Sequence, residues 1–284
     1  MKLSFITDEA TQDFMEAVEF ALLYHLDGLE LRSVNDLPID RIDRNSLIHW
    51  KSVLDSHGLK VPCLSGSFYK CAHDDAQAIA ENLEKLERLA IAADILECPY
   101  IRGFAFFINE QNPVSYEEIV PYFTEPVRIL EQHNKILLLE ADPSVNTTNH
   151  AQLFRLLSMI HHPRVKAIFD PGNDLYDPWK EVPYPDGYEA IAPYILHIHI
   201  KDALCPEGGE PYCVKPGTGA VNYPALLAAL RRDGYHGYLS LETHYRKQTQ
   251  LSEELMRLPQ GCAFSNGGME SSAESILALQ KMLR

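Results

Sequence analysis

Eight short β-rich segments recur along the sequence, and helical segments separate them. The eight segments cover residues 2–7, 28–32, 60–66, 100–107, 135–141, 165–170, 195–201 and 237–243. Strands that alternate with helices favour a parallel sheet joined by crossover helices. Several segments are nearly continuous apolar runs, which is typical of strands with helices on one face and a packed barrel interior on the other. The pattern predicts an α/β fold, a single-domain (β/α)8 TIM barrel over residues 1–284.

An open, doubly wound sheet is the main alternative. That fold usually needs a Gly-rich phosphate loop after an early strand, whereas TDEATQD follows the first segment here. Helical periodicity is clear in residues 75–97 and similar in 13–25, 223–234 and 271–284. The stretches 171–193 and 205–219 read as long irregular connections on the face where barrel enzymes keep their active sites.

Charge and composition exclude several classes of partner. With 25 basic and 40 acidic residues the net charge is −15, and no basic cluster offsets it, so neither nucleic acid nor a membrane surface is an expected partner. The N-terminal segment becomes acidic too early for a signal peptide, and no apolar run is long enough to span a membrane. Six widely spaced cysteines without a CxxC pair fit scattered reduced thiols. We therefore expect a cytoplasmic protein.

Three of the predicted strands end in an acidic residue. Glu140, Asp170 and Glu242 each follow an apolar run. Because the C-terminal strand ends of a barrel meet at one opening, the three carboxylates should lie close together. Crowded carboxylates stay ionised there only if a cation neutralises them. A bound metal ion is the simplest solution, although an acid at a strand end can also cap the next helix or face solvent.

His199, near the end of the seventh strand, completes a set of four candidate ligands. One imidazole with three carboxylates suits Mn, Co, Zn, Mg or Fe(II). The sequence thus predicts one divalent metal ion held by Glu140, Asp170, His199 and Glu242. His197 shares the face of His199, because residues two apart on a strand point the same way, but it lies one layer deeper. We expect it to support the ligands or to belong to the core.

At these residues the sequence resembles the xylose isomerase-like barrels. This superfamily of sugar isomerases and epimerases includes tagatose and psicose 3-epimerases, inosose isomerases and dehydratases, and endonuclease IV. The resemblance rests on residues 136–144, 167–173, 195–203, 215–230 and 235–245, with weaker similarity at 26–32 and near Lys70. It implies a single metal at the four ligand positions, and it suggests dimers or tetramers.

One position departs from two branches of that superfamily. Endonuclease IV carries a histidine three residues beyond the sixth-strand acid, and the sugar 3-epimerases tend to do so, whereas this sequence has Asn173. The further histidine motif that endonuclease IV has after the seventh strand is also missing. Together with the acidic charge balance, these departures argue against DNA repair.

The reaction expected at such a site is removal of a proton next to a carbonyl, with a metal-stabilised ene-diolate. Glu140 and Glu242 come from different strands, so one can act as general base while the other returns a proton. Return to the opposite face gives epimerisation, and return to the adjoining carbon gives isomerisation. The predicted function is a metal-dependent isomerase or epimerase of a small sugar, sugar phosphate or cyclitol.

Further polar residues near strand ends are candidates for binding the sugar or polyol substrate. Cationic side chains there could orient a hydroxyl, a ketone oxygen or a phosphate. The candidates are Arg32, Lys70, Asn173, Lys201, Asp202 and His244. Lys201 and Asp202 are included because the family has similar sequence after the ligand histidine.

Other residues near strand ends have two interpretations. Arg102 could face the site or point outward as an ion-pair partner, and Glu30 could hold Arg32 or Lys70 in place. Aromatic residues could wall the pocket or simply pack in the barrel, namely Phe68, Tyr69, Phe104 and Phe106.

Three other functions stay open from the sequence. An inosose dehydratase-like lyase would share the metal and differ by losing water. A phosphodiesterase similar to endonuclease IV would use the metal to activate water. A non-catalytic sugar-binding barrel is the third, and the complete ligand set argues against it.

Overall fold

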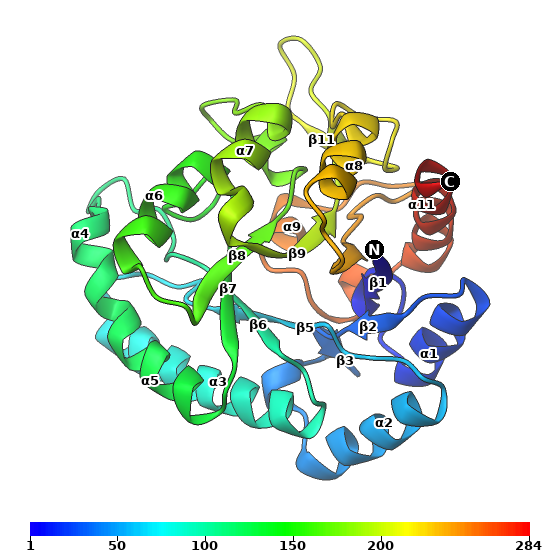
Figure 1. Ribbon diagram of the computed structural model, residues 1–284, viewed down its shortest axis with the longest axis horizontal. Coiled ribbons are helices and arrows are strands. Elements are labelled where there is room, and N and C mark those ends of the chain that lie inside the picture. Colours follow the sequence, from blue (N-terminus) through cyan, green and yellow to red (C-terminus); the bar gives the residue numbers. More distant parts are fainter.

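Eight parallel strands form the centre of the molecule and helices surround them (Figure 1). The computed structural model describes all 284 residues. The barrel strands are β1 (Lys2–Ile6), β2 (Gly28–Glu30), β5 (Cys63–Phe68), β6 (Tyr100–Gly103), β7 (Ile136–Glu140), β8 (Val165–Phe169), β9 (Ile195–Ile200) and β12 (Tyr238–Leu241). Seven lie within the predicted segments. The exception is β5, which begins after Pro62, a residue with no amide hydrogen to donate, and ends two residues beyond the predicted segment, at Phe68.

The strands close into a ring. Their hydrogen-bonded order is β2-β1-β12-β9-β8-β7-β6-β5, and every neighbouring pair is parallel. Isolated parallel bridges from Gly28 to Lys60 and from Leu31 to Leu64 join the two ends. The predicted TIM barrel is therefore confirmed, and all eight strand ends meet at one opening.

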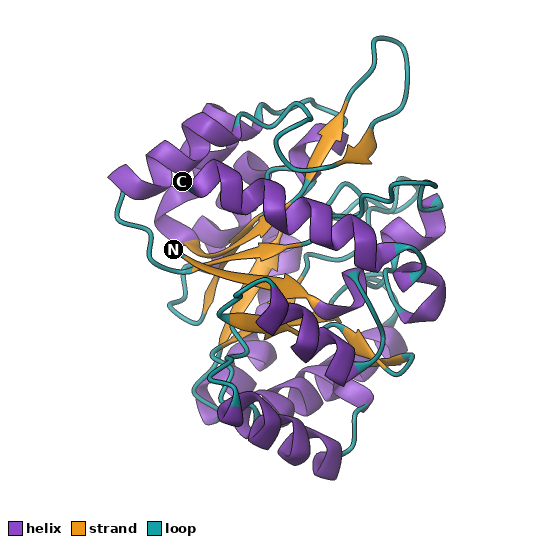
Figure 2. Cartoon of the chain, turned by 90° about the vertical axis from the view of Figure 1, so that its right-hand side faces the viewer, coloured by secondary structure: helices purple, strands orange, loops and turns teal.

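Helices form the outer layer (Figure 2). The main ones are α1 (Phe14–Leu23), α2 (Arg44–Ser56), α3 (Ala76–Ile95), α5 (Thr124–Gln132), α6 (His150–Ile160), α8 (Tyr223–Arg232) and α11 (Gly268–Leu283). Shorter helices are α4 (Tyr116–Ile119), α7 (Tyr188–Ile191), α9 (Glu253–Arg257) and α10 (Gly261–Ser265). The four helices predicted from periodicity are α1, α3, α8 and α11. Polar side chains begin several helices, as Asp75 does when it accepts hydrogen bonds from the amides of Gln77 and Ala78.

Apolar packing is divided between the two faces of the barrel wall. A cluster of 57 buried residues fills the space between the strands and the helices. Inside the barrel, by contrast, Cys63, Leu138 and Ile168 form a separate cluster of three buried residues. Because this inner cluster is small, polar and charged side chains occupy the barrel interior near the C-terminal ends of the strands.

The two connections predicted to be irregular are more ordered than expected. Residues 205–219 include β11 (Tyr212–Val214), which pairs antiparallel with β10 (Asp202–Leu204). Residues 171–193 contain short helical turns and α7. A second two-stranded ribbon, β3 (Ser33–Val34) and β4 (Leu37–Pro38), follows β2. All six cysteines are free thiols, and no helix is both long and apolar enough to cross a membrane.

Candidate active site

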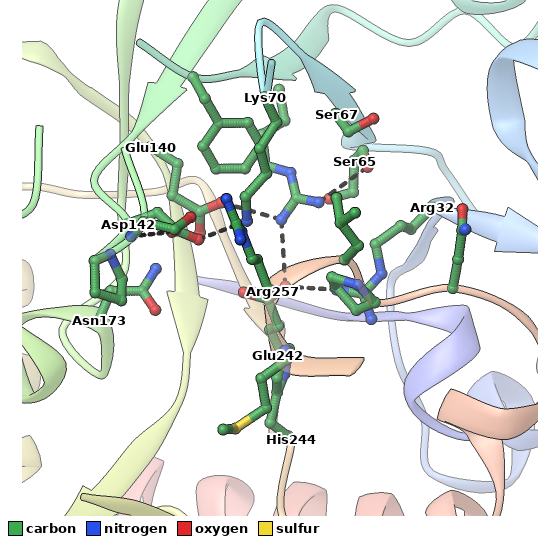
Figure 3. A pocket seen from close by; sticks show the side chains of 18 of the residues that line it. Arg32, Ser65, Ser67, Lys70, Glu140, Asp142, Asn173, Glu242, His244 and Arg257 are labelled. Atoms are coloured by element: carbon green, nitrogen blue, oxygen red, sulfur yellow. Dashed lines mark hydrogen bonds and ion pairs between the residues drawn. The ribbon is translucent and has the colours of Figure 1, made fainter. Parts of the chain in front are cut away.

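A pocket of about 640 Å³ opens where the barrel strands end. Its lining includes Glu140 at the end of β7, Lys201 after β9 and Glu242 after β12. Figure 3 shows Glu140 and Glu242 converging from different strands, with Arg257 of α9 extending into the same space. The pocket therefore lies on the face that the sequence indicated.

The four predicted ligands come together at the base of this pocket. One ligand atom from each of Glu140, Asp170, His199 and Glu242 lies within 4.8 Å of the other three, and all four residues are buried. His199 Nδ1 is 2.8 Å from Glu140 Oε1 and 3.2 Å from Glu242 Oε2. Strand geometry explains the convergence, since the C-terminal ends of the parallel strands of a barrel lie at one level.

Buried cations surround the same carboxylates. Lys201 Nζ donates to Asp170 Oδ2 at 2.7 Å and to Glu242 Oε2 at 3.1 Å. Arg102 donates from Nη1 to Glu140 Oε2 at 3.0 Å and to Glu242 Oε1 at 3.2 Å, and Arg32 Nη1 lies 2.6 Å from that same Glu242 oxygen. Glu242 thus has cations at both of its oxygens.

Arg102 faces the interior, so its alternative interpretation as an outward ion-pair partner is wrong. It is paired in register with Leu138, a member of the inner apolar cluster. Neighbouring residues in register on parallel strands point to the same face, so Arg102 points inward too.

These ion pairs set the protonation of the acids. Burial alone would raise the pKa of Glu242, but Lys201 and His199 bring it well below its ordinary value. Burial is likewise outweighed at Glu140, where His199 and Arg102 lower the pKa. At Asp170 burial prevails, and the pKa is raised although Lys201 opposes the change. Glu140 and Glu242 are therefore ionised at neutral pH, as a general base must be.

His197 and Glu30 lie beneath the four predicted ligands, and Glu30 contacts both His197 and the ligand His199. Glu30 Oε1 is 3.1 Å from His199 Nε2, and Glu30 Oε2 is 2.8 Å from His197 Nε2. Glu30 also accepts a hydrogen bond from Ser65. His197 lies in the deeper layer that the sequence predicted. Glu30, however, holds the two histidines rather than Arg32 or Lys70.

The donor set fits a divalent cation. His199 turns Nδ1 toward the carboxylates, while its other nitrogen meets Glu30, an arrangement that fixes the ring of a metal-bound histidine. Three carboxylates and one imidazole are the donor types that Mn, Mg, Zn and Fe(II) accept. In the structure itself, Lys201, Arg102 and Arg32 neutralise these acids.

Five of the six residues predicted to bind substrate line the pocket, namely Arg32, Lys70, Asn173, Lys201 and His244. Asn173 Oδ1 accepts a hydrogen bond from Lys201 Nζ at 2.9 Å, and Lys70 Nζ donates to Asp142 at 2.8 Å. His244 Nδ1 lies 2.9 Å from Glu9 Oε1 but outside hydrogen-bonding geometry. All five side chains are thus placed where they could meet a bound molecule.

Asp202 is the exception, and its predicted place at the substrate is a correction. Its carboxylate turns away from the pocket lining and accepts the backbone amides of Ala203, Gly217, Gly219 and Val221 at 2.9–3.1 Å. A side chain at residue 219 would collide with this carboxylate, because a Cβ there would lie 2.2 Å from Asp202 Oδ1. Asp202 holds the returning loop after β11.

Of the four aromatic residues considered for the pocket wall, only Phe104 lines it. Phe68 and Phe106 instead stack on Tyr69, with ring centroids 3.9 and 4.3 Å apart. These three residues belong to the outer apolar core.

Sequence reasoning missed several acids that shape the site. Asp8 and Glu9, directly after β1, hold Arg32 at 2.8 and 3.0 Å. Asp142, two residues beyond Glu140, holds Lys70. The signal that would have found them is the one used for the ligands, an acid just past the end of a strand.

Comparison with known families agrees with this geometry. The sequence model of the xylose isomerase-like TIM barrel family matches residues 18–264, and the protein belongs to that family. No curated protein matches the sequence. The resemblance noted from the sequence motifs is therefore confirmed at the level of the family.

Solved structures share the fold at low sequence identity. The zinc-bound IolI protein is 18% identical, with a TM-score of 0.76 over 100% of this chain and 98% of that one. The probable 3-DHS dehydratase AsbF from Bacillus anthracis is 20% identical, with a TM-score of 0.72 over 98% and 99%. D-psicose 3-epimerase with D-tagatose, from Clostridium cellulolyticum H10, is 15% identical, with a TM-score of 0.75 over 100% of both chains.

Proposed function

We propose that this protein is a divalent-metal-dependent isomerase or epimerase that acts on a small sugar or cyclitol. The observation that carries the proposal is the convergence of Glu140, Asp170, His199 and Glu242 at the base of the pocket, each buried and each within reach of a common centre. Two of these residues are ionised glutamates from different strands, so either of them can act as the base that removes a proton from carbon.

The four ligands would hold the metal ion. When bound, such an ion supplies Lewis-acid polarisation of a carbonyl oxygen. The ammonium group of Lys201, now on Asp170 and Glu242, would then be available to a substrate oxygen, as would the guanidinium groups of Arg32 and Arg102. The same cations thus neutralise the carboxylates in the absence of a ligand and can orient hydroxyl groups in its presence.

Glu140 and Glu242 are the proposed proton carriers. Arg32 and Lys201 fix opposite oxygens of Glu242, and Arg102 joins Glu242 to Glu140. This network holds both carboxylates in one orientation before a substrate arrives, which reduces the reorganisation needed in the reaction. A carbon placed between them can lose a proton to one ionised glutamate, and the other glutamate, once it has taken up a proton from solvent, can return that proton to the opposite face of the carbon.

Relatives support the choice of reaction. Among similar structures are D-psicose 3-epimerase with D-tagatose, the IolI protein with zinc, and a 3-keto-D-glucoside 4-epimerase from E. coli. Isomerisation or epimerisation of a hydroxy ketone is the chemistry that fits both these relatives and the paired glutamates of this chain.

Exchange of substrate hydrogen with solvent deuterium tests the proposal. The protein is incubated in D2O with Mn²⁺ or Mg²⁺ and with a panel of ketoses and inososes, and the products are read by NMR and mass spectrometry. We expect deuterium at the carbon next to the carbonyl, and no exchange after chelation. Loss of water from the product would assign the lyase reaction instead. Exchange that survives complete chelation would contradict metal dependence.

A further inference from the structure

One cation of the pocket lacks a carboxylate partner. Five Lys and Arg residues line the pocket, namely Arg32, Lys70, Arg102, Lys201 and Arg257. The first four each form an ion pair with an acid of the site. Arg257 forms neither an ion pair nor a hydrogen bond, although Glu110 and Glu253 line the same pocket. Its positive charge is therefore not neutralised by the protein.

Aromatic rings lie beside four of the five pocket cations, and of these four Arg257 alone has no carboxylate partner. Arg257 Cζ lies 4.3 Å from the ring centroid of Phe107, and Lys70 Nζ lies 4.6 Å from that of Phe104. Both rings belong to the connection after β6. A ring face holds a cation in position without supplying a counter-charge, whereas the acid of a salt bridge offsets the positive charge of its partner. Arg257 is thus both oriented and free to bind an anion.

The position of Arg257 separates it from the reacting groups. Arg257 is the last residue of α9, and its neighbours within residues 256–260 also line the pocket. Glu140 and Glu242, by contrast, lie at the ends of the barrel strands. Figure 3 shows the Arg257 side chain extending into the pocket. A small molecule could therefore meet the acid cluster at one end and Arg257 at the other.

We infer that the substrate of this pocket carries a carboxylate or phosphate group, which Arg257 binds at the pocket mouth. The inference rests on the proposed function for the reaction at the other end of the molecule. A guanidinium group binds either anion through paired hydrogen bonds. The protein as a whole carries a charge of −15 and repels anions at long range, so a local cation is needed to capture one.

Calorimetric titration with three matched six-carbon probes tests the inference: D-glucitol, D-gluconate and D-glucitol 6-phosphate. We expect the wild-type protein to bind at least one anion about tenfold more tightly than the neutral polyol, which corresponds to one charge-assisted interaction. The anion that binds more tightly identifies the class. Arg257→Gln should remove this preference and leave D-glucitol binding unchanged, while Arg257→Lys should keep part of it.

Arg155→Gln is the matched control. Arg155 is also an exposed arginine over an aromatic ring, 5.5 Å from the centroid of Tyr116, but it does not line the pocket. Its replacement should leave all three affinities unchanged. Equal affinity for the three probes, failure of both anions to bind, or equal losses in the two Gln variants would overturn the inference.

Calorimetry measures binding without turnover. Its result can therefore contradict the anionic substrate while the proposed reaction stands, and the exchange experiment can do the reverse. An Arg257-dependent preference for anions without deuterium exchange would support the anionic ligand and contradict the proposed isomerase reaction. Exchange with neutral ketoses and no preference for anions would give the opposite result.

Discussion

The two faces of the barrel wall are buried by different means. Outside the strands, 57 apolar residues pack against the helices. Inside, only Cys63, Leu138 and Ile168 form an apolar cluster, and above them lie buried ion pairs among Glu30, Arg102, His199, Lys201 and Glu242. The outer layer gains stability from apolar burial, whereas buried ion pairs add little net stability. Stability therefore comes mainly from the outer layer, and the groups of the proposed reaction lie in the inner one.

Replacing Glu242 by Gln should have the largest effect, and on activity. The change keeps the shape but removes the charge that Arg32, Arg102 and Lys201 surround. Loss of a general acid or base lowers the rate by about 10²–10⁴-fold, measured as deuterium exchange. Glu253→Gln is the control, since Glu253 lines the same pocket and has no ion-pair partner. Full activity in both variants would contradict the assignment of the reaction to the inner layer.

Replacing Leu89 by Ala should show the opposite pattern. Leu89 is fully buried in α3, within the outer cluster, and its Cδ1 lies only 2.6 Å from where a Cβ of residue 66 would stand. A cavity there should cost about 2–5 kcal/mol of unfolding free energy, measured by urea denaturation. The rate per folded molecule should stay unchanged.

Leu22→Ala serves as the matched control for the outer layer, because Leu22 is 39% exposed in α1. We expect a change in unfolding free energy within about 0.5 kcal/mol. A loss of exchange rate in the Leu89 variant, at a temperature where it is folded, would show that the outer layer also sets the chemistry.

Replacing Asp202 by Asn sharpens the boundary between the layers. The amide nitrogen of Asn cannot accept the hydrogen bonds that Asp202 Oδ2 receives from the amides of Gly217 and Gly219. Unsatisfied buried groups should lower the unfolding free energy by about 1–3 kcal/mol, with little change in exchange rate. A large loss of exchange rate per folded molecule would instead indicate that Asp202 contacts the substrate.

The smallest expected effect lies at the outer surface, at the contact between α3 and the end of α5. His133 Nδ1 is 2.6 Å from Asp94 Oδ2, and this hydrogen bond raises the pKa of His133. The pair therefore stabilises the fold below about pH 6.5, and its contribution is lost as pH rises through the raised pKa.

His133→Gln should accordingly cost more stability at about pH 6 than at about pH 9. The difference should stay below about 1 kcal/mol, because solvent screens a pair this close to the surface. Thermal denaturation at both pH values measures it. A cost that is equal or greater at the higher pH would contradict the assigned pair.

The sequence predicted the features that follow from the order of apolar and polar residues along the chain. Apolar runs marked the eight strands, and an acid at the end of a run marked each of the three carboxylates that converge in the pocket. Arg102 could not be oriented, because the direction of a side chain on a four-residue strand depends on its register with β7. Asp202 was misplaced because its partners are backbone amides of a loop whose return path no local pattern specifies.

The sequence placed Arg32 and Lys201 at the site as substrate-binding residues, and it did not predict that they pair with the acids. Crowded acids suggested a metal, yet Lys201, Arg102 and Arg32 lie on the same oxygens. Which positive charge neutralises the acids is a matter of three-dimensional distances that spacing along the chain does not give.

Metal content tests the account most directly. The wild-type protein and Asp170→Ala are dialysed against Mn²⁺, Mg²⁺ or Zn²⁺, and the bound ions are counted by mass spectrometry alongside deuterium exchange. We predict one divalent ion per wild-type chain and exchange that depends on it, with both lost in the variant. A wild-type chain that binds no ion and still catalyses exchange would show that Lys201 and the two arginines are the only cations the site uses.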